Sequence, residues 1–130
     1  MAVTQIGLMG CGRIGRDIFR ILYKSEEMQL AAISDTADHK AVEYLLRFDT
    51  ILGPFPDEIS IKGEHLYVAG RQIPMLSGKE PGDVPWGDLG VDVVIEATAQ
   101  ARSREELELH LKQGAKRVIQ IGRASCRERV

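Results

Sequence analysis

The 130-residue sequence has few of the features that mark disulfide-rich, metal-binding or membrane proteins. Its two cysteines, Cys11 and Cys126, provide neither a disulfide framework nor the paired spacing of a metal site. Its apolar runs are shorter than the roughly 20 residues that a membrane-spanning helix needs. Its charge is nearly balanced, with 17 basic and 19 acidic residues. We therefore expect a soluble, cytoplasmic protein that binds neither nucleic acid nor a membrane.

Glycine, in contrast, is placed in a regular pattern near the start of the chain. An apolar run at 3–9 is typical of a β-strand and is followed by Gly10, Gly12 and Gly15, which have the spacing G-x-G-x-x-G. An amphipathic helix is expected over 13–25. In such a unit the first glycine makes a tight turn, the second lets the backbone approach a pyrophosphate, and the third lets the helix pack closely on the strand. The pattern predicts a phosphate-binding turn at the helix N-terminus.

An acidic residue follows at the distance expected for a dinucleotide site. The run 30–34 predicts a second strand, which ends at Asp35, twenty residues after Gly15. A carboxylate in this position accepts the two ribose hydroxyls of an adenosine and repels a 2′-phosphate, which favours NAD over NADP. The alternative is that Asp35 only caps the helix that follows.

The remaining pattern predicts an α/β fold. In chain order we expect a helix at 39–48, short strands at 59–61, 66–68 and 72–75, a loop at 77–90, a strand at 91–95, a helix from the Ser103 capping box to Gly114, and a strand that begins at 116. The three short strands alternate in polarity and predict a small antiparallel meander. The sequence thus indicates a Rossmann-type, doubly wound, mainly parallel sheet with a meander inserted.

Helical spacing and residue type also lead to specific expectations about burial. We expect the buried helix faces to carry Ile14, Ile18 and Ile21 or Leu22 in the first helix, and Val42, Leu45 and Leu46 in the second. Cys11 is expected to be a packing residue, with a pKa that the helix N-terminus could lower. The three histidines His39, His65 and His110 are expected to be solvated.

The glycine stretch also carries a resemblance to a known family. Residues 6–16, IGLMGCGRIGR, resemble the GINGFGRIGR signature of phosphorylating glyceraldehyde-3-phosphate dehydrogenases, with Met9 and Cys11 in place of the family's Asn and Phe. Further similarities follow in the same order: Ser34-Asp35 to the family's Asn-Asp, residues 46–55 to KYDSTHGRF, Pro85-Trp86 to LPW, and residues 114–119 to GAKKVI. The resemblance covers nearly all of residues 1–120.

The resemblance implies a set of cofactor-binding residues for NAD. These are Gly10, Gly12, Arg13, Ile14, Gly15, Asp35, Lys79 and Thr98. The first five would hold the pyrophosphate and Asp35 the adenosine ribose. Lys79 takes the place of a basic residue near the adenine, with a solvated loop lysine as the alternative. Thr98 matches the Thr of the family's ESTG and lies just past a predicted strand, but Ala97 and Ala99 replace the Ser and Gly beside it.

The resemblance further implies the oxidation of a phosphorylated aldehyde with NAD and phosphate, in glycolysis. In that reaction a cysteine thiolate, activated by a histidine, attacks the aldehyde, and phosphate cleaves the resulting thioester. Neither catalytic residue matches a position in this chain, so we assign no catalytic residue and expect the chain alone to be inactive. The full enzyme is expected to be a homo-oligomer. The alternatives are a sister enzyme, such as an erythrose-4-phosphate dehydrogenase, or a non-catalytic NAD-binding, redox-sensing module.

The last ten residues do not continue the family pattern. Residues 121–130 contain three arginines and one glutamate, and they resemble one reading frame of a widely used sequencing adaptor. We interpret residues 1–120 as an incomplete NAD-binding domain and residues 121–130 as a non-native tail. The alternative is an authentic basic tail.

Overall fold

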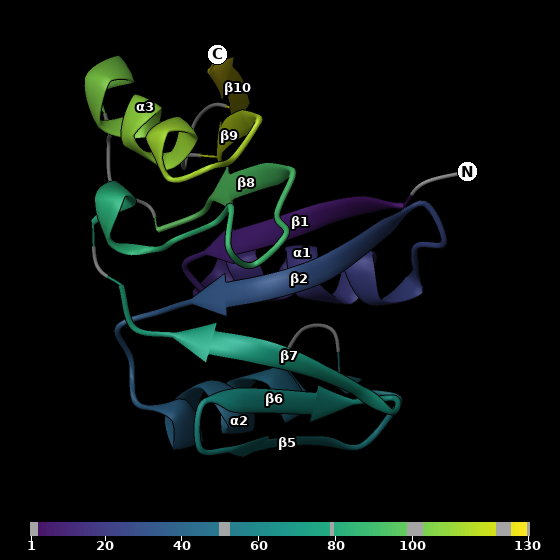
Figure 1. Ribbon diagram of the computed structural model, residues 1–130. Helices are drawn as coiled ribbons and strands as arrows, with labels where there is room; N and C mark the ends of the chain where they lie inside the picture. The colour runs from purple at the N-terminus through teal and green to yellow at the C-terminus, as the bar shows by residue number, and fades with distance from the viewer. Residues whose placement is uncertain (1–2, 50–52, 79, 99–102, 122–125, 130) are drawn as a thin grey trace.

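The computed structural model describes residues 3–49, 53–78, 80–98, 103–121 and 126–129. Its main feature is one eight-stranded sheet (Figure 1). The strand order is β10 (Cys126–Arg129), β9 (Arg117–Ile121), β8 (Val93–Glu96), β1 (Thr4–Met9), β2 (Met28–Ser34), β7 (Arg71–Leu76), β6 (His65–Val68) and β5 (Ile59–Lys62). The five strands from β9 to β7 are mutually parallel, whereas β10, β6 and β5 pair antiparallel with their neighbours.

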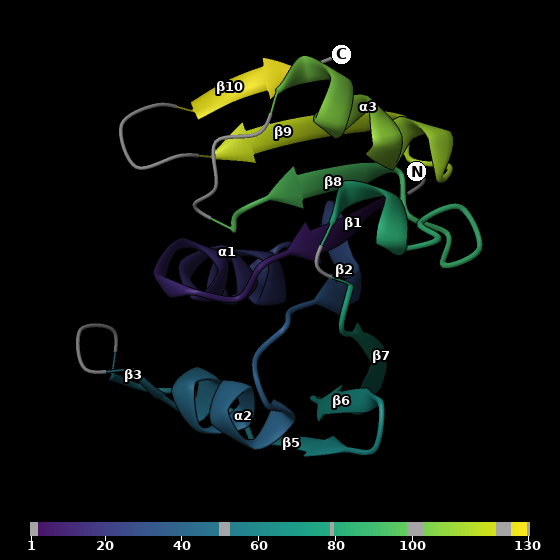
Figure 2. The ribbon, with the colours of Figure 1, turned by 90° about the vertical axis from the view of Figure 1, so that its left-hand side faces the viewer.

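Helices cover both faces of this sheet, as Figure 2 shows from the side. The helices are α1 (Arg13–Lys24), α2 (His39–Arg47) and α3 (Arg104–Lys112), with a short 3-10 helix at Pro81–Asp83. Side chains from α1 and α2 pack with Ile6 and Leu8 of β1, while Leu107 of α3 packs with Met9. Since alternate residues of a strand point to opposite faces, β1 contributes to both cores. The presence of helices on both faces of the sheet confirms the doubly wound α/β fold.

Most predicted elements are present within one or two residues of the predicted bounds. The antiparallel meander β5–β7 is confirmed, and the expected loop at 77–90 contains the 3-10 helix. A two-residue ribbon, β3 (Phe48–Asp49) with β4 (Gly53–Pro54), follows α2. Helix α3 begins with the predicted capping box, in which Ser103 accepts from the backbone N–H of Glu106 and Glu106 accepts from that of Ser103. Gly114, at φ +110°, follows its C-cap.

The buried faces of the first two helices match the predicted ones in part, since Leu22 is buried and Ile18 is partly buried against the core. In α1 the side that faces the sheet carries Gly15, Phe19 and Leu22, whereas Ile14 and Ile21 are 40% and 63% exposed. The close contact of Gly15 with the preceding turn determines which side of the helix faces the strands. In α2, Val42 and Leu46 are buried as expected, and Leu45 is exposed.

The meander is joined to the rest of the sheet by a short contact. Strand β7 pairs with β2 only through Ile33 with Met75 and Ser34 with Leu76. Helix α2 is tied to the meander by Glu43, whose carboxylate accepts a hydrogen bond from the backbone N–H of Ile61 at 2.8 Å. Strands β5 to β7 and α2 therefore form a unit beside the part of the sheet that contains β1, β2 and β8.

Candidate functional site

The turn between β1 and α1 lies at the centre of the candidate site. Gly10 has φ +97°, a conformation that residues with a side chain rarely adopt. Its N–H donates to the carbonyl of Ser34 at 2.8 Å, and a Cβ at Gly10 would lie 2.9 Å from the backbone of Ala97. The turn is thus held between the carboxyl ends of β2 and β8, and only glycine fits at this point.

The other two glycines have different surroundings. A Cβ at Gly15 would lie 2.2 Å from the carbonyl oxygen of Gly10, so the third glycine allows the helix to approach the turn. A Cβ at Gly12 would meet nothing within 4 Å. Because the first N–H groups of a helix have no intrahelical acceptor, this open space beside Gly12 has the chemistry that a phosphate group requires.

The two residues after Gly12 contribute differently from each other. The guanidinium of Arg13 lies 2.6 Å from the carboxylate of Asp49, whose side chain is 1% exposed. This ion pair anchors the start of α1 to β3 and occupies the Arg13 guanidinium. Ile14 is partly exposed on the first turn of α1. Both residues therefore offer the site their backbone N–H groups at the helix N-terminus.

Arg16 is a neighbour of the turn that sequence reasoning missed. Its side chain is largely buried, and its Nε donates to the carbonyl of Gly12 at 3.2 Å. It places a positive charge against the glycine turn from the side of the core. Its place four residues after Gly12, one helical turn on, was the only signal in the sequence for this contact.

Asp35 lies beside the turn at the end of β2. One carboxylate oxygen accepts from the backbone N–H of Cys11 at 2.5 Å, and the other accepts from that of Ala37 at 2.7 Å. The residue that caps α2 is Asp38, which accepts from the N–H of Lys40. Asp35 is therefore not the cap of α2, and its negative charge is fixed against the phosphate-binding turn.

Cys11 is a packing residue, as expected, but its ionisation differs from the expectation. Its side chain is buried in the core beneath α1. Burial, together with the nearby charge of Asp35, raises the pKa of the Cys11 thiol to about 12. The thiol therefore stays protonated at neutral pH and is not a nucleophile.

Thr98 lies at the other side of the turn, just past the end of β8. The segment is held to β1 because the N–H of Ala97 donates to the carbonyl of Met9 at 2.7 Å. The Thr98 hydroxyl donates to the carboxylate of Glu96 at 2.5 Å. Lys79 and Ala99 lie outside the described residues, so the structure does not place them.

His110 contradicts the expectation that the histidines are solvated. It is fully buried on α3, between the indole of Trp86 and the carboxylate of Glu96. Both ring nitrogens have a hydrogen-bond partner, which makes the burial of this polar side chain possible. The pattern of leucines around His110 predicted the helix but gave no sign of these two partners.

The sheet order brings the three parts of the site into one row. Strand β1 lies between β2 and β8, so the glycine turn has Asp35 on one side and Thr98 on the other. The carboxyl edge of an open parallel sheet is where ligands bind in doubly wound folds. A row of carboxylate, phosphate-binding turn and hydroxyl has the order of groups that a dinucleotide needs. Within the described part of the chain, no cluster of three potential metal ligands occurs.

Comparison with known proteins agrees with this geometry. The family model described as "Glyceraldehyde 3-phosphate dehydrogenase, NAD binding domain" matches residues 4–104. The chain belongs to this family. It is 40% identical over 119 residues to the glyceraldehyde-3-phosphate dehydrogenase of Thermotoga maritima and 38% identical over 119 residues to that of Geobacillus stearothermophilus. It is also 41% identical over 123 residues to glyceraldehyde-3-phosphate dehydrogenase 1 of Streptomyces arenae.

The chain carries the NAD-binding domain of the glyceraldehyde-3-phosphate dehydrogenase family. The three alignments cover 90%, 92% and 94% of this chain but only 36%, 35% and 37% of the relatives. The chain thus spans about a third of the length of the curated relatives it matches. The resemblance found from the motifs is confirmed by both the family model and these relatives.

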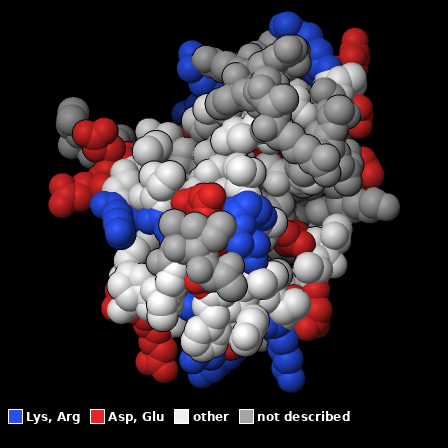
Figure 3. Space-filling view, turned by 180° about the vertical axis from the view of Figure 1, so that it is seen from behind, with Lys and Arg blue, Asp and Glu red and all other residues white. Residues whose placement is uncertain are grey.

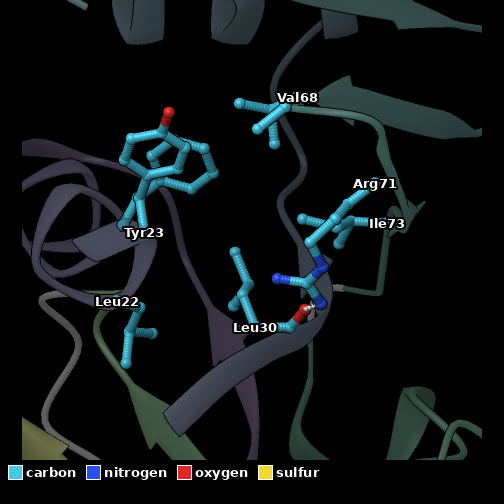
Figure 4. A pocket seen from close by; sticks show the side chains of 8 residues that line it. Leu22, Tyr23, Leu30, Val68, Arg71 and Ile73 are labelled. Carbon is cyan, nitrogen blue, oxygen red and sulfur yellow. Dashed lines mark hydrogen bonds between the residues drawn. The ribbon is translucent and has the colours of Figure 1, made fainter. Parts of the chain in front are cut away.

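An apolar pocket lies near the C-terminal end of α1, apart from the row at the carboxyl edge of the sheet. It has a volume of about 100 Å³ and is lined by Phe19, Leu22, Tyr23, Leu30, Val68, Ala69, Arg71 and Ile73 (Figure 4). Arg71 donates to the carbonyl of Leu30 at 3.0 Å. The pocket lies away from the glycine turn, which is at the N-terminal end of the same helix.

The surface of the domain carries both signs of charge. On the face shown in Figure 3, basic and acidic side chains lie interspersed among uncharged ones. None of the helices within the described ranges has the length and apolar character needed to cross a membrane.

Proposed function

We propose that the row at the carboxyl edge of the sheet binds NAD, with one part of the dinucleotide on each element. The pyrophosphate is held by Gly10, Gly12, Gly15 and the backbone of Arg13 and Ile14. Asp35 binds the adenosine ribose, and Thr98 the nicotinamide nucleoside. The family resemblance assigns Lys79, which is outside the described residues, to the adenine. The observation that carries this proposal is the open space at Gly12 between Asp35 and Thr98. NAD, when bound, would supply a hydride acceptor.

We further propose that Asp35 makes the site selective for NAD over NADP. Its carboxylate is fixed by the N–H groups of Cys11 and Ala37, so it cannot turn away from a ligand without losing both bonds. A 2′-phosphate on the adenosine ribose would place a second negative charge beside it.

The proposed activity of the full protein is the oxidation of a phosphorylated aldehyde with NAD and phosphate. The printed names of the relatives support this proposal. In this chain the domain binds and orients the cofactor, and the Cys11 thiol, which is protonated at neutral pH, does not serve as the nucleophile for the aldehyde. We propose a cytoplasmic homo-oligomer for the full enzyme.

We also propose that the NAD-binding domain comprises residues 1–120 and that residues 121–130 do not belong to it. The structure pairs β10 antiparallel with β9, at the edge of the sheet. Sequencing of the native gene across codon 120 tests this boundary. A reading frame that continues into a cysteine nucleophile and a later histidine supports both the boundary and the dehydrogenase activity. A frame that ends at Val130 contradicts both.

The binding proposal is tested by the Gly12→Ala variant. The added methyl group meets no protein atom within 4 Å, so we expect an unchanged melting temperature. If the pyrophosphate occupies this space, the methyl group costs about 1–3 kcal/mol, and the Kd for NAD rises roughly tenfold or more. Isothermal titration calorimetry measures the Kd, and differential scanning calorimetry measures the melting temperature.

Gly82→Ala is the matched control for this experiment. A Cβ at Gly82 makes ordinary contact with Leu109 at 3.9 Å, in the 3-10 helix outside the row. We expect it to leave the Kd for NAD unchanged. Unchanged NAD affinity in folded Gly12→Ala would show that the pyrophosphate does not bind at the turn.

A further inference from the structure

Behind Thr98 lies a buried chain of hydrogen bonds that runs through three different parts of the fold. The indole Nε1 of Trp86 donates to Nδ1 of His110 at 2.8 Å. Nε2 of His110 lies 3.0 Å from Oε1 of Glu96, and the other oxygen of Glu96 accepts from the Thr98 hydroxyl. Trp86, His110 and Glu96 are each at most 1% exposed, so water does not compete for these bonds.

The donors and acceptors in this chain determine the direction of every proton. An indole N–H can only donate, so Nδ1 of His110 accepts and its proton is carried by Nε2. Nε2–H then donates to Glu96. The Thr98 hydroxyl donates to the other oxygen of Glu96, so its proton points to that side chain. The lone pairs of the Thr98 oxygen remain as acceptors for a ligand.

The packing around these hydrogen bonds keeps Trp86, His110 and Glu96 in place. A Cβ at Gly7 would lie 2.6 Å from the Trp86 ring, so the indole lies directly on the backbone of β1. His110 is held on α3, and Glu96 is the last residue of β8. Since α3 and β8 share one core with Trp86, each residue of the hydrogen-bond series is held by packed secondary structure.

We propose that Trp86, His110 and Glu96 position Thr98 as a hydrogen-bond acceptor for the nicotinamide half of the dinucleotide. Thr98 lies on the opposite side of the glycine turn from Asp35, which places it beside the nicotinamide nucleoside. That nucleoside carries O–H and N–H donors in its ribose and carboxamide groups. The inference rests on the proposed NAD site. Glu96 and His110 are positioning residues, since they act through Thr98.

The contact itself is tested with Thr98→Val, which keeps the shape of the side chain and removes the hydroxyl. Loss of one hydrogen bond should raise the Kd for NAD about fivefold. The Kd for ADP, which has no nicotinamide nucleoside, should stay within about twofold because the adenosine and pyrophosphate contacts remain. Thr98→Ser is the matched control, since it retains the hydroxyl and should bind NAD as the parent does.

The positioning role is tested with Glu96→Gln. His110 still requires an acceptor, so the amide oxygen takes the place of Oε1 and the amide NH₂ faces Thr98. The NH₂ group donates to the Thr98 oxygen and turns the hydroxyl proton toward the ligand. We expect the Kd for NAD to rise about fivefold with little change for ADP. Both changes act at the Thr98 oxygen. The double variant Glu96→Gln with Thr98→Val should therefore raise the Kd for NAD about fivefold rather than about 25-fold.

The outcomes separate this inference from the proposed function. If the parent chain does not bind NAD, the proposed function is wrong and the inference falls with it. Suppose that Thr98→Val weakens the binding of NAD but not of ADP. If Glu96→Gln then has no effect, or if the two effects multiply, the positioning role is wrong and the NAD site stands. If Glu96→Gln does not fold, His110→Phe replaces it in the same cycle. That variant keeps a ring in the core but removes the donor that fixes Glu96, so the carboxylate no longer holds the Thr98 hydroxyl in one orientation, and we expect a selective, non-multiplying loss of NAD affinity.

Discussion

At the scale of single residues, the fixed carboxylate of Asp35 is the feature with the most direct consequence for binding. It accepts backbone N–H groups from the glycine turn and from its own loop, at 2.5 and 2.7 Å. The same side chain therefore holds the glycine turn and, in the proposed site, provides the charge beside the ribose. Its removal should affect both.

The Asp35→Asn variant should weaken NAD binding about tenfold and narrow the preference for NAD over NADP. The amide has one acceptor oxygen and no charge, so one of the two N–H groups loses its partner and the repulsion of a 2′-phosphate disappears. Fluorescence titration with both cofactors measures the two affinities. Asp38→Ala is the control, because it removes the cap of α2 and costs about 1 kcal/mol of stability without changing the affinity for NAD. Tighter binding of NADP than of NAD by the parent would contradict the role of Asp35.

The buried Cys11 thiol predicts how stability depends on pH. In the unfolded chain the thiol ionises near its ordinary pKa of 9.0, and in the folded chain only near about 12. Between these values the unfolded state binds fewer protons, so the free energy of unfolding should fall as pH rises. The contribution of Cys11 is fully present below pH 9 and is lost at a rate of up to about 1.4 kcal/mol per pH unit.

Urea denaturation of the parent and of Cys11→Ala from pH 8 to pH 11 measures this effect. The difference between the two free energies of unfolding isolates Cys11 from tyrosines and lysines that also titrate. We expect this difference to shrink as pH rises above 9. A difference that stays constant would show that the thiol ionises equally well in both states.

At the scale of elements, local rules predicted the starts and ends of helices and strands well. The Ser103 capping box, the glycine at 114 and the alternating meander each depend on residues close together in sequence. The glycine turn and Asp35 were also predictable, since one strand–helix–strand unit contains both. The parts of the site that local patterns specify were therefore predicted from the sequence.

Contacts between distant elements were not predictable in the same way. The burial of His110 depends on Trp86, 24 residues earlier, and on Glu96 at the end of a neighbouring strand. The side of α1 that faces the sheet depends on the contact of Gly15 with the turn, and helical periodicity alone favoured isoleucines that are exposed. These outcomes follow from three-dimensional packing, which overrides the local pattern.

At the scale of the whole molecule, the proposed site is confined to the centre of the sheet. Its described residues belong to segments that adjoin β1, β2 or β8, while β10, the strand at the edge of the sheet, pairs with β9. The described part of residues 122–130 therefore contributes no strand to the row of Asp35, glycine turn and Thr98.

Deletion of residues 122–130 should leave NAD binding unchanged. We expect the Kd to stay within about twofold, since the strands that carry the row keep their pairing, and we expect a modest drop in melting temperature because β9 loses its antiparallel neighbour. Calorimetry of the shortened chain and the parent measures both. Loss of NAD binding by a shortened chain that still melts cooperatively would show that the tail is part of the functional domain.

The short contact between β2 and β7 has an evolutionary consequence. Two residue pairs join β7 to β2, and β5 and β6 pair with none of β1, β2 and β8, so changes of length at the turn between β5 and β6 need not disturb the register of those three strands. A single residue inserted between β1 and α1 would instead displace Gly12 and Gly15 from the contacts that define the turn. The turn between β5 and β6 can therefore accept insertions and deletions during descent, whereas the turn between β1 and α1 can change almost only by substitution.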